Sequence, residues 1–203
     1  MDTRERLIEC IAELQAVVAS LEPPKPNPAP VAGTAGPICW GAKVSKEFRE
    51  SVLWIEGELK LKANFLMPCM GFETGLTFSA SKRNPASSAT GLIQFMDATA
   101  KGLGTTTKAL AEMSTVKQLS YVYKYFKAFG NDLSAWDLAD TYMAILLPSM
   151  IGKPLDAAMN WTSGAYAVNK GLDADKNKVV TKREAYNRVK ALYDLGMQPQ
   201  NMA

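Results

Sequence analysis

The acidic side chain best placed for chemistry is Glu73, which follows an apolar run at residues 65–70. A carboxyl group beside apolar walls is poorly hydrated, so its pKa rises and it stays protonated near neutral pH, as a general acid requires. A turn-rich polar loop follows, and then the compact unit G-L-I-Q-F at residues 91–95. Gly91 permits close backbone approach to a ligand, and the amide of Gln94 offers a donor and an acceptor to a sugar hydroxyl or N-acetyl group.

The composition excludes several other kinds of site. The 203 residues contain no histidine, which removes Ser-His-Asp catalysis, Cys-His catalysis and every His-ligated zinc site. Carboxylates are therefore the natural proton donors. The formal net charge of +3 suits an anionic surface such as a bacterial wall and is too small to predict nucleic-acid binding. The apolar neighbours of Cys69 favour a buried free thiol over a disulfide with Cys39.

We expect no targeting or membrane segment. Residues 1–20 alternate charged and apolar side chains and do not form the apolar centre of a signal peptide. The apolar stretch at residues 144–147 stops at Pro148 and is far shorter than a membrane span.

A second motif with chemical potential occupies residues 173–184, with the sequence D-A-D-K-N-K-V-V-T-K-R-E. The spacing of its oxygen donors is that of an EF-hand calcium loop. The expected ligands are Asp173, Asp175, Asn177, the Val179 carbonyl, Thr181 and Glu184. Lys178 stands where the sharp turn favours glycine, so we expect left-handed strain and reduced affinity. The alternative is a metal-free loop in which Thr181 and Glu184 cap the last helix.

The elements that must position these residues are predicted to be helices. Phe48, Val52, Ile55 and Leu59 form one apolar face after Ser45, a typical N-cap. Six further helices are expected, from Pro68 into Glu73, from about Leu92 to Lys101, from Lys108 to Met113, from a Thr115/Gln118 capping box to Gly130, from Ser134 and Asp137 to Pro148, and from Lys182 to Leu195. No stretch shows the alternation of a β-strand, so the fold class is mainly α.

The N-terminal part is predicted to be a separate docking unit. Leu7, Ile11, Leu14, Val18 and Leu21 follow a 4-3-4-3 spacing, which predicts a short coiled-coil helix at residues 1–21. Residues 22–36 are rich in proline and predict an extended, semi-rigid linker. The globular domain then covers residues 37–203. The alternative for the first helix is that it packs on that domain.

The motif around Glu73 resembles a known enzyme superfamily. Residues 73–75, E-T-G, are followed by A-T-G-L-I-Q-F-M at residues 89–96, by Thr99-Ala100 and by Leu103-Gly104. This order resembles the soluble lytic transglycosylases and goose-type lysozymes, most closely phage-encoded members, over residues 60–190. The resemblance implies a lysozyme-like helical fold that cleaves the β-1,4 bond between N-acetylmuramic acid and N-acetylglucosamine. It also implies that Glu73 is the acid and that Gln94 and the Gly91-Leu92 backbone bind saccharide.

Two departures from the family pattern affect the remaining site residues. Thr74 stands where the family often has serine, and its hydroxyl keeps the possibility of orienting Glu73. The family's later tyrosine, usually in an A-Y-N-A-G unit, has no clean counterpart. Tyr142 has the better spacing from Gln94, and Tyr166 is the alternative. Thr74 and Tyr142 are therefore added to the expected substrate site.

The number of carboxylates decides the mechanism. An inverting hydrolase needs a second carboxylate about 6.5–9.5 Å from the acid, and a retaining enzyme needs one at about 5–5.5 Å. A lytic transglycosylase needs Glu73 alone. Asp97, Asp137 and Asp140 are candidate second carboxylates, although Asp97 also fits the first turn of a helix and Asp137 a cap. The sequence leaves hydrolysis and anhydro-product formation open.

Three biological settings fit these features. The first is a lysozyme of the phage virion, held in the tail or baseplate through residues 1–21 and acting on peptidoglycan in the cell wall or periplasm. The second is a free endolysin that collects in the host cytoplasm before release. The third is a structural virion protein that binds glycan without cutting it. Calcium would be structural in each, and the chemistry needs no cofactor.

Overall fold

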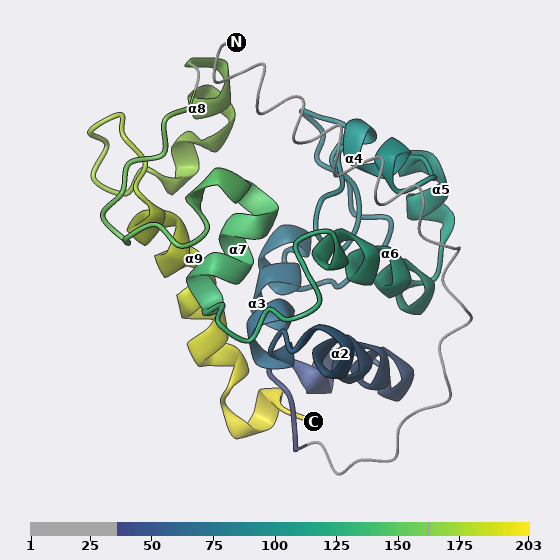
Figure 1. The fold of residues 1–203 in the computed structure, drawn as a ribbon. Coiled ribbons are helices and arrows are strands. Elements are labelled where there is room, and N and C mark those ends of the chain that lie inside the picture. The colour runs from purple at the N-terminus through teal and green to yellow at the C-terminus, as the bar shows by residue number, and fades with distance from the viewer. Residues whose placement is uncertain (1–35, 162) are drawn as a thin grey trace.

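The computed structural model describes residues 36–161 and 163–203, and these residues form a mainly helical fold (Figure 1). Its helices are α2 (Lys46–Leu59), α3 (Ala63–Thr74), α4 (Asp97–Gly102), α5 (Thr107–Glu112), α6 (Thr115–Lys127), α7 (Leu138–Leu146), α8 (Ser163–Asn169) and α9 (Lys182–Gly196), with 3₁₀ turns η1 (Gly41–Lys43), η2 (Pro148–Met150), η3 (Lys170–Leu172) and η4 (Pro199–Asn201). Isolated β-bridges occur, but this part of the chain contains no strand. The predicted mainly α class is confirmed.

Two expectations about chain organisation concern the N-terminal segment and membrane-spanning helices. The predicted docking helix at residues 1–21 and nearly all of the linker at residues 22–36 lie outside the described residues. Among the helices that are described, none combines the length and the apolar character needed to cross a lipid bilayer.

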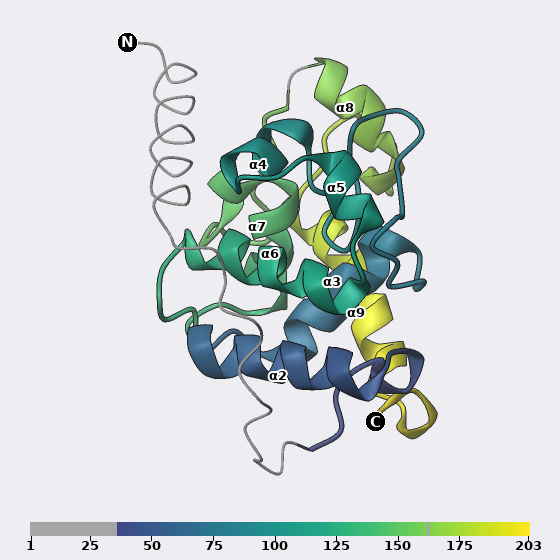
Figure 2. The same cartoon turned by 90° about the vertical axis from the view of Figure 1, so that its right-hand side faces the viewer.

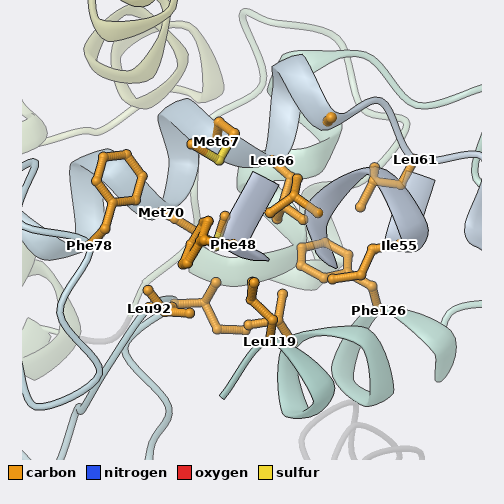
Figure 3. Close-up of a cluster of buried hydrophobic side chains, with 14 of the residues drawn as sticks. Phe48, Ile55, Leu61, Leu66, Met67, Met70, Phe78, Leu92, Leu119 and Phe126 are labelled. Atoms are coloured by element: carbon orange, nitrogen blue, oxygen red, sulfur yellow. The ribbon is translucent and has the colours of Figure 1, made fainter. Parts of the chain in front are cut away.

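Helix α3 lies in the middle of the molecule, with α7 and α9 on one side and α2 and α6 on the other (Figure 1). A helix that is apolar around its whole circumference must be covered on all sides, and α3 is such a helix. Its Leu66 and Met70 belong to one buried cluster (Figure 3), and its Cys69 belongs to a second cluster shared with α7 and α9. Packing from both sides therefore fixes the helix that carries Glu73.

Helix α2 forms as its pattern predicts. The Ser45 hydroxyl accepts a hydrogen bond from the Phe48 amide at 3.3 Å, which caps the helix. Phe48, Ile55 and the other two residues of the predicted face are at most 1% exposed. Burying each such side chain stabilises the fold by about 1.5–3 kcal/mol. This face packs against α6, and the two helices lie side by side in Figure 2.

Three predicted helix starts are wrong because tertiary contacts override local signals. Helix α3 begins at Ala63 and takes Pro68 into its interior, where burial of the helix offsets a cost of about 3 kcal/mol. The segment after Gly91 is a tight turn, and α4 begins only at Asp97. Helix α6 is capped by Ser114, whose hydroxyl accepts from the Lys117 amide at 3.2 Å, so the expected Thr115/Gln118 capping box is not formed.

Other helix ends follow short-range signals more closely. Helix α7 begins after Asp137, whose carboxylate accepts from the Asp140 amide at 2.8 Å, so this residue is the cap and the expected start at Ser134 is wrong. Helix α9 carries the expected capping box between Thr181 and Glu184. Helix α8 and the turn after it correspond to no helix predicted from the sequence.

Candidate active site

Glu73 is the penultimate residue of α3 and lies beside Cys69, one turn earlier, and Tyr142 of α7. Its side chain is half-buried, and the protein around the carboxyl group excludes enough water to raise its pKa from 4.5 to about 7. No hydrogen bond or ion pair engages this carboxyl group within residues 36–161 and 163–203. A large fraction of Glu73 is therefore protonated at neutral pH, as a general acid needs to be.

The wall beside Glu73 consists of the buried side chains of Cys69 and Tyr142. Neither carries a positive charge that would oppose protonation of Glu73. Cys69 is 0% exposed and Tyr142 is 1% exposed. Burial, and after it the negative charge of Glu73, raises the pKa of each of these two groups well above its usual value. Both therefore stay neutral. The nearest cation that acts on this wall is Arg188, which opposes the rise in the pKa of Tyr142 only weakly.

Tyr142, rather than Tyr166, is the tyrosine that the structure brings near Glu73. Its ring packs edge-on against Phe72 with ring centroids 5.5 Å apart, and its pKa responds to the charge of Glu73. The Tyr166 hydroxyl instead donates to a carboxylate oxygen of Asp173 at 2.6 Å. Tyr142 thus forms part of the wall behind the acid and shows almost no surface to solvent.

The Thr74 hydroxyl is engaged by the backbone on both sides. It donates to the Met70 carbonyl at 2.7 Å and accepts from the Phe78 amide at 3.1 Å. Thr74 is 0% exposed. Its contacts hold the end of α3 and the turn that follows, and no hydrogen bond joins it to Glu73 among the described residues.

The chain leaves α3 through a strained turn. Gly75, Leu76 and Phe78 have φ of 62°, 61° and 47°, and Gln94 in the facing loop has φ of 51°. Side chains other than glycine rarely adopt this left-handed region, and each such residue costs about 1–3 kcal/mol unless its surroundings compensate. Strain of this kind gathers at ligand-binding and catalytic sites, so its position here agrees with a functional role for the stretch.

The unit at residues 91–95 is a tight turn closed by its own backbone. The Thr90 amide donates to the Phe95 carbonyl at 3.0 Å, and the Phe95 amide returns a bond to Thr90 at 2.8 Å. The side-chain nitrogen of Gln94, Nε2, donates to the Gly91 carbonyl at 3.0 Å and to the Lys82 carbonyl at 3.2 Å. The carbonyl oxygen of this half-buried side chain receives no hydrogen bond from the described residues, so it keeps its capacity to accept one from a ligand.

Leu92 joins this turn to α3. Its side chain is 0% exposed and lies in the cluster that contains Met70 and Phe78 (Figure 3). The side chain therefore belongs to the core, and the backbone amide of Leu92 is bound by a residue that the sequence suggested only as part of a capping box. That residue is Gln118, whose side-chain oxygen accepts from Leu92 at 2.7 Å.

The three candidate second carboxylates all have structural partners. Asp140 accepts from the Lys182 ammonium at 2.5 Å and from the Gly152 amide at 2.9 Å. Asp137 caps α7, and Asp97 accepts from the Thr107 hydroxyl at 2.6 Å. None of these three aspartates forms a hydrogen bond with Glu73 among the described residues. Each of them already has a structural contact.

The loop at residues 173–184 brings three carboxylates together. Oxygen atoms of Asp173, Asp175 and Glu184 lie within 4.8 Å of one another, as a divalent cation requires. Lys178 has φ of 69°, so the expected left-handed conformation at the glycine position is confirmed. The carboxylate of Asp173 also accepts from the Lys178 amide at 2.9 Å, and Glu184 accepts from the Thr181 amide at 2.8 Å.

These hydrogen bonds close the loop on itself. Two further groups of the predicted ligand set also take part in bonds of this kind. The Asn177 side-chain oxygen accepts from the Val179 amide at 2.7 Å, and the Thr181 hydroxyl donates to Glu184 at 2.8 Å. Each of these oxygens keeps a lone pair that could still reach a cation. The three carboxylates form a possible cation cluster, and calcium with the complete set of six ligands stays a prediction.

A cavity of about 440 Å³ lies between α3, α9 and this loop. Its lining residues are Phe72, Ala174, Glu184, Asn187, Arg188, Ala191 and Leu192. Phe72 precedes Glu73 in the chain, but Glu73 itself is not part of the lining. The cavity therefore adjoins the candidate acid without containing it.

No protein-family model matches the sequence, and no curated protein matches it significantly. The function therefore has to be inferred from the chemistry around Glu73.

Proposed function

We propose that this protein is a peptidoglycan-degrading glycosidase that cleaves the β-1,4 bond between N-acetylmuramic acid and N-acetylglucosamine. The observation that carries the proposal is the half-buried position of Glu73 near the end of the central helix, where its carboxyl group has no hydrogen bond or ion pair among the described residues and burial raises its pKa to about 7. Desolvation without a neighbouring cation makes this group a proton donor and, after transfer, a base of matched strength. The turn at residues 91–95, packed on the same helix through Leu92, is the proposed saccharide-binding unit.

A mechanism with one carboxylate agrees best with the surroundings of Glu73. The protonated acid donates to the glycosidic oxygen as the bond to the anomeric carbon breaks. The resulting carboxylate then takes the proton of the muramic 6-hydroxyl, whose oxygen attacks the same carbon and closes a 1,6-anhydro ring. The attack is intramolecular and gains from proximity. Because Asp97, Asp137 and Asp140 each serve a structural contact, we favour this lytic transglycosylase route over hydrolysis.

Mass spectrometry of muropeptides tests both parts of the proposal at once. Purified walls digested with the wild-type protein should release disaccharide products ending in anhydro-muramic acid, and Glu73→Gln should release almost none. Asp97→Asn, which removes an exposed charge, is a matched control and should leave the product pattern unchanged. Equal product yields from Glu73→Gln and wild type would overturn the assignment, and products ending in a reducing muramic acid would favour a hydrolase.

The proposed setting is a lysozyme of the phage virion, tethered to tail or baseplate proteins through residues 1–21 and acting in the bacterial cell wall. A free endolysin is the alternative within the same activity. Detection of the protein in purified particles separates these two. A folded protein that binds walls but never clears them would instead be a structural glycan-binding protein.

A further inference from the structure

Gln118 is a buried polar residue whose side chain connects three segments of the chain. It lies in the first half of α6 and is 0% exposed. Its amide nitrogen donates to the Ala80 carbonyl at 3.1 Å and to the Leu110 carbonyl at 2.8 Å, and its oxygen accepts from the Leu92 amide at 2.7 Å. The loop after α3, the end of α5 and the turn at residues 91–95 are therefore held by one side chain.

The backbone beside Gln118 is shaped to admit it. A Cβ atom placed on Gly91 would overlap the oxygen, nitrogen and carbon atoms of the Gln118 amide. Gly91 also has φ of 82°, which favours glycine independently. Its lack of a side chain therefore makes room for a residue of the protein itself, whereas the sequence suggested room for a ligand.

Only a neutral amide meets all three backbone groups. Glutamate at position 118 would accept from Leu92 but could not donate to the two carbonyls, and its charge would be buried without a cation. Methionine has similar size but makes none of the three bonds, which would leave the Leu92 amide and the Ala80 carbonyl without the partner that Gln118 provides. The chemistry of the side chain is thus matched to the geometry of the turn.

We propose that Gln118 is the positioning residue of the saccharide-binding turn. Its three hydrogen bonds hold the Gly91–Leu92 peptide of this turn against the loop after α3 and the end of α5, and its loss weakens glycan binding while the acid on α3 is left intact. The inference rests on the proposed function, because it assumes that the turn at residues 91–95 contacts glycan.

The test compares binding with turnover. Gln118→Met should raise KM for soluble peptidoglycan strands about tenfold and change kcat by less than about twofold, because the lost contacts act equally on bound substrate and transition state. Thr141→Val is the matched control. It removes a buried hydroxyl that donates to the Asp137 carbonyl at 2.7 Å in α7, so it costs stability but should leave KM unchanged.

A double-mutant cycle tests the contact itself, and its single variant Gly91→Ala, which keeps the Gln118 amide, still reports on the turn if Gln118→Met fails to fold. Gly91→Ala should raise KM about tenfold in the wild-type background but less than about threefold in Gln118→Ala, because the added methyl group then has space. Equal effects in both backgrounds would overturn the proposal, as would an unchanged KM in a folded Gln118→Met protein. A wild-type protein that cuts no wall would refute the proposed function instead. Binding of an N-acetylglucosamine oligosaccharide would then still report on Gln118.

Discussion

The protonation state of Glu73 depends on what surrounds it more than on its own chemistry. The carboxyl group has Cys69 and Tyr142 as neutral neighbours, and burial alone accounts for the rise in its pKa. A nearby lysine or arginine would have lowered the pKa and removed the acid. Burial therefore raises the pKa of Glu73 with no opposing effect of a cation among the described residues, and this makes Glu73 suited to proton transfer.

Replacing Glu73 should remove activity with little effect on glycan binding. Glu73→Gln keeps the size of the side chain but can neither donate nor recover the proton, so kcat should fall about 10²–10⁴-fold. Wild-type activity should also fall as pH rises through about 7, because the reaction needs the protonated group. Initial rates on soluble glycan strands from pH 5 to 9 measure both effects. A profile that stays level across this range would contradict the assignment.

The same substitution should change stability in a pH-dependent way. Because the pKa of Glu73 rises from 4.5 to about 7 on folding, the folded protein binds this proton more tightly than the unfolded chain. Wild-type stability is therefore lost as pH rises from about 4.5 through 7, and Glu73→Gln escapes that loss. The variant should be more stable than wild type at pH 8 by up to about 3 kcal/mol, and this advantage should vanish near pH 4. Urea unfolding at both pH values measures the difference. An advantage of equal size at both would rule out desolvation as its cause.

The first turn of the C-terminal helix α9 contacts both the loop at residues 173–184 and helix α7. The loop at residues 173–184 ends at its capping box, and Lys182 reaches from that turn to Asp140 of α7. The Lys182 side chain is 4% exposed, and its ammonium also donates to the carbonyls of Met150 and Lys153 at 3.1 Å and 2.9 Å. The first turn of α9 therefore takes part both in closing the loop at residues 173–184 and in the contact between α9 and α7.

Breaking the Lys182–Asp140 pair should be costly because it leaves a charge without its partner. Lys182→Met should lower the free energy of unfolding by about 3–5 kcal/mol. The double variant with Asp140→Leu should recover part of this loss, since no buried carboxylate remains unpaired. Denaturant unfolding of both single variants and the double variant measures the coupling. Additive losses would show that the two side chains do not stabilise each other.

Calcium should stabilise the loop at residues 173–184 if the three converging carboxylates bind it. Melting in millimolar calcium should then occur above melting in chelator, because a ligand that binds only the folded state raises its stability. Asp173→Ala should abolish the difference. Lys178→Gly should enlarge it, because glycine adopts a φ of 69° without strain and removes a positive charge. Identical melting curves in calcium and chelator for wild type and Lys178→Gly would leave only the capping role.

At the scale of the whole molecule, two buried clusters meet on α3. The first cluster includes α2, α6 and the turn at residues 91–95, and the second includes α7 and α9. Because α3 contributes side chains to both, Glu73 is held by packing on each side of its helix. Within residues 36–161 and 163–203, the two clusters extend from Ile38 to Val189.

The proline-rich linker at residues 22–36 predicts that the proposed catalytic domain folds without the N-terminal segment. Deleting residues 1–36 should leave a folded, monomeric and active domain, because the two clusters formed by the described residues are retained. Circular dichroism, size-exclusion chromatography and turbidity loss on purified walls measure the three properties. Loss of solubility or of wall cutting after this deletion would show that the first helix belongs to the core, and the tether would have to be abandoned.

The sequence by itself determined the features that depend on neighbours a few residues away. The apolar face of α2, the cap at Asp137, the capping box of α9 and the left-handed Lys178 follow from contacts within about one helical turn. The apolar run before Glu73 likewise indicated a desolvated carboxyl group.

Only the tertiary structure decided the features that join distant segments. Gln118 looked like a capping residue, yet it binds Leu92 and Ala80, 26 and 38 residues away. Asp140 looked like a free carboxylate, yet it pairs with Lys182, 42 residues later. Local patterns record the preferences of one helix or turn, whereas the partner of a buried polar group depends on which segments the hydrophobic clusters bring together.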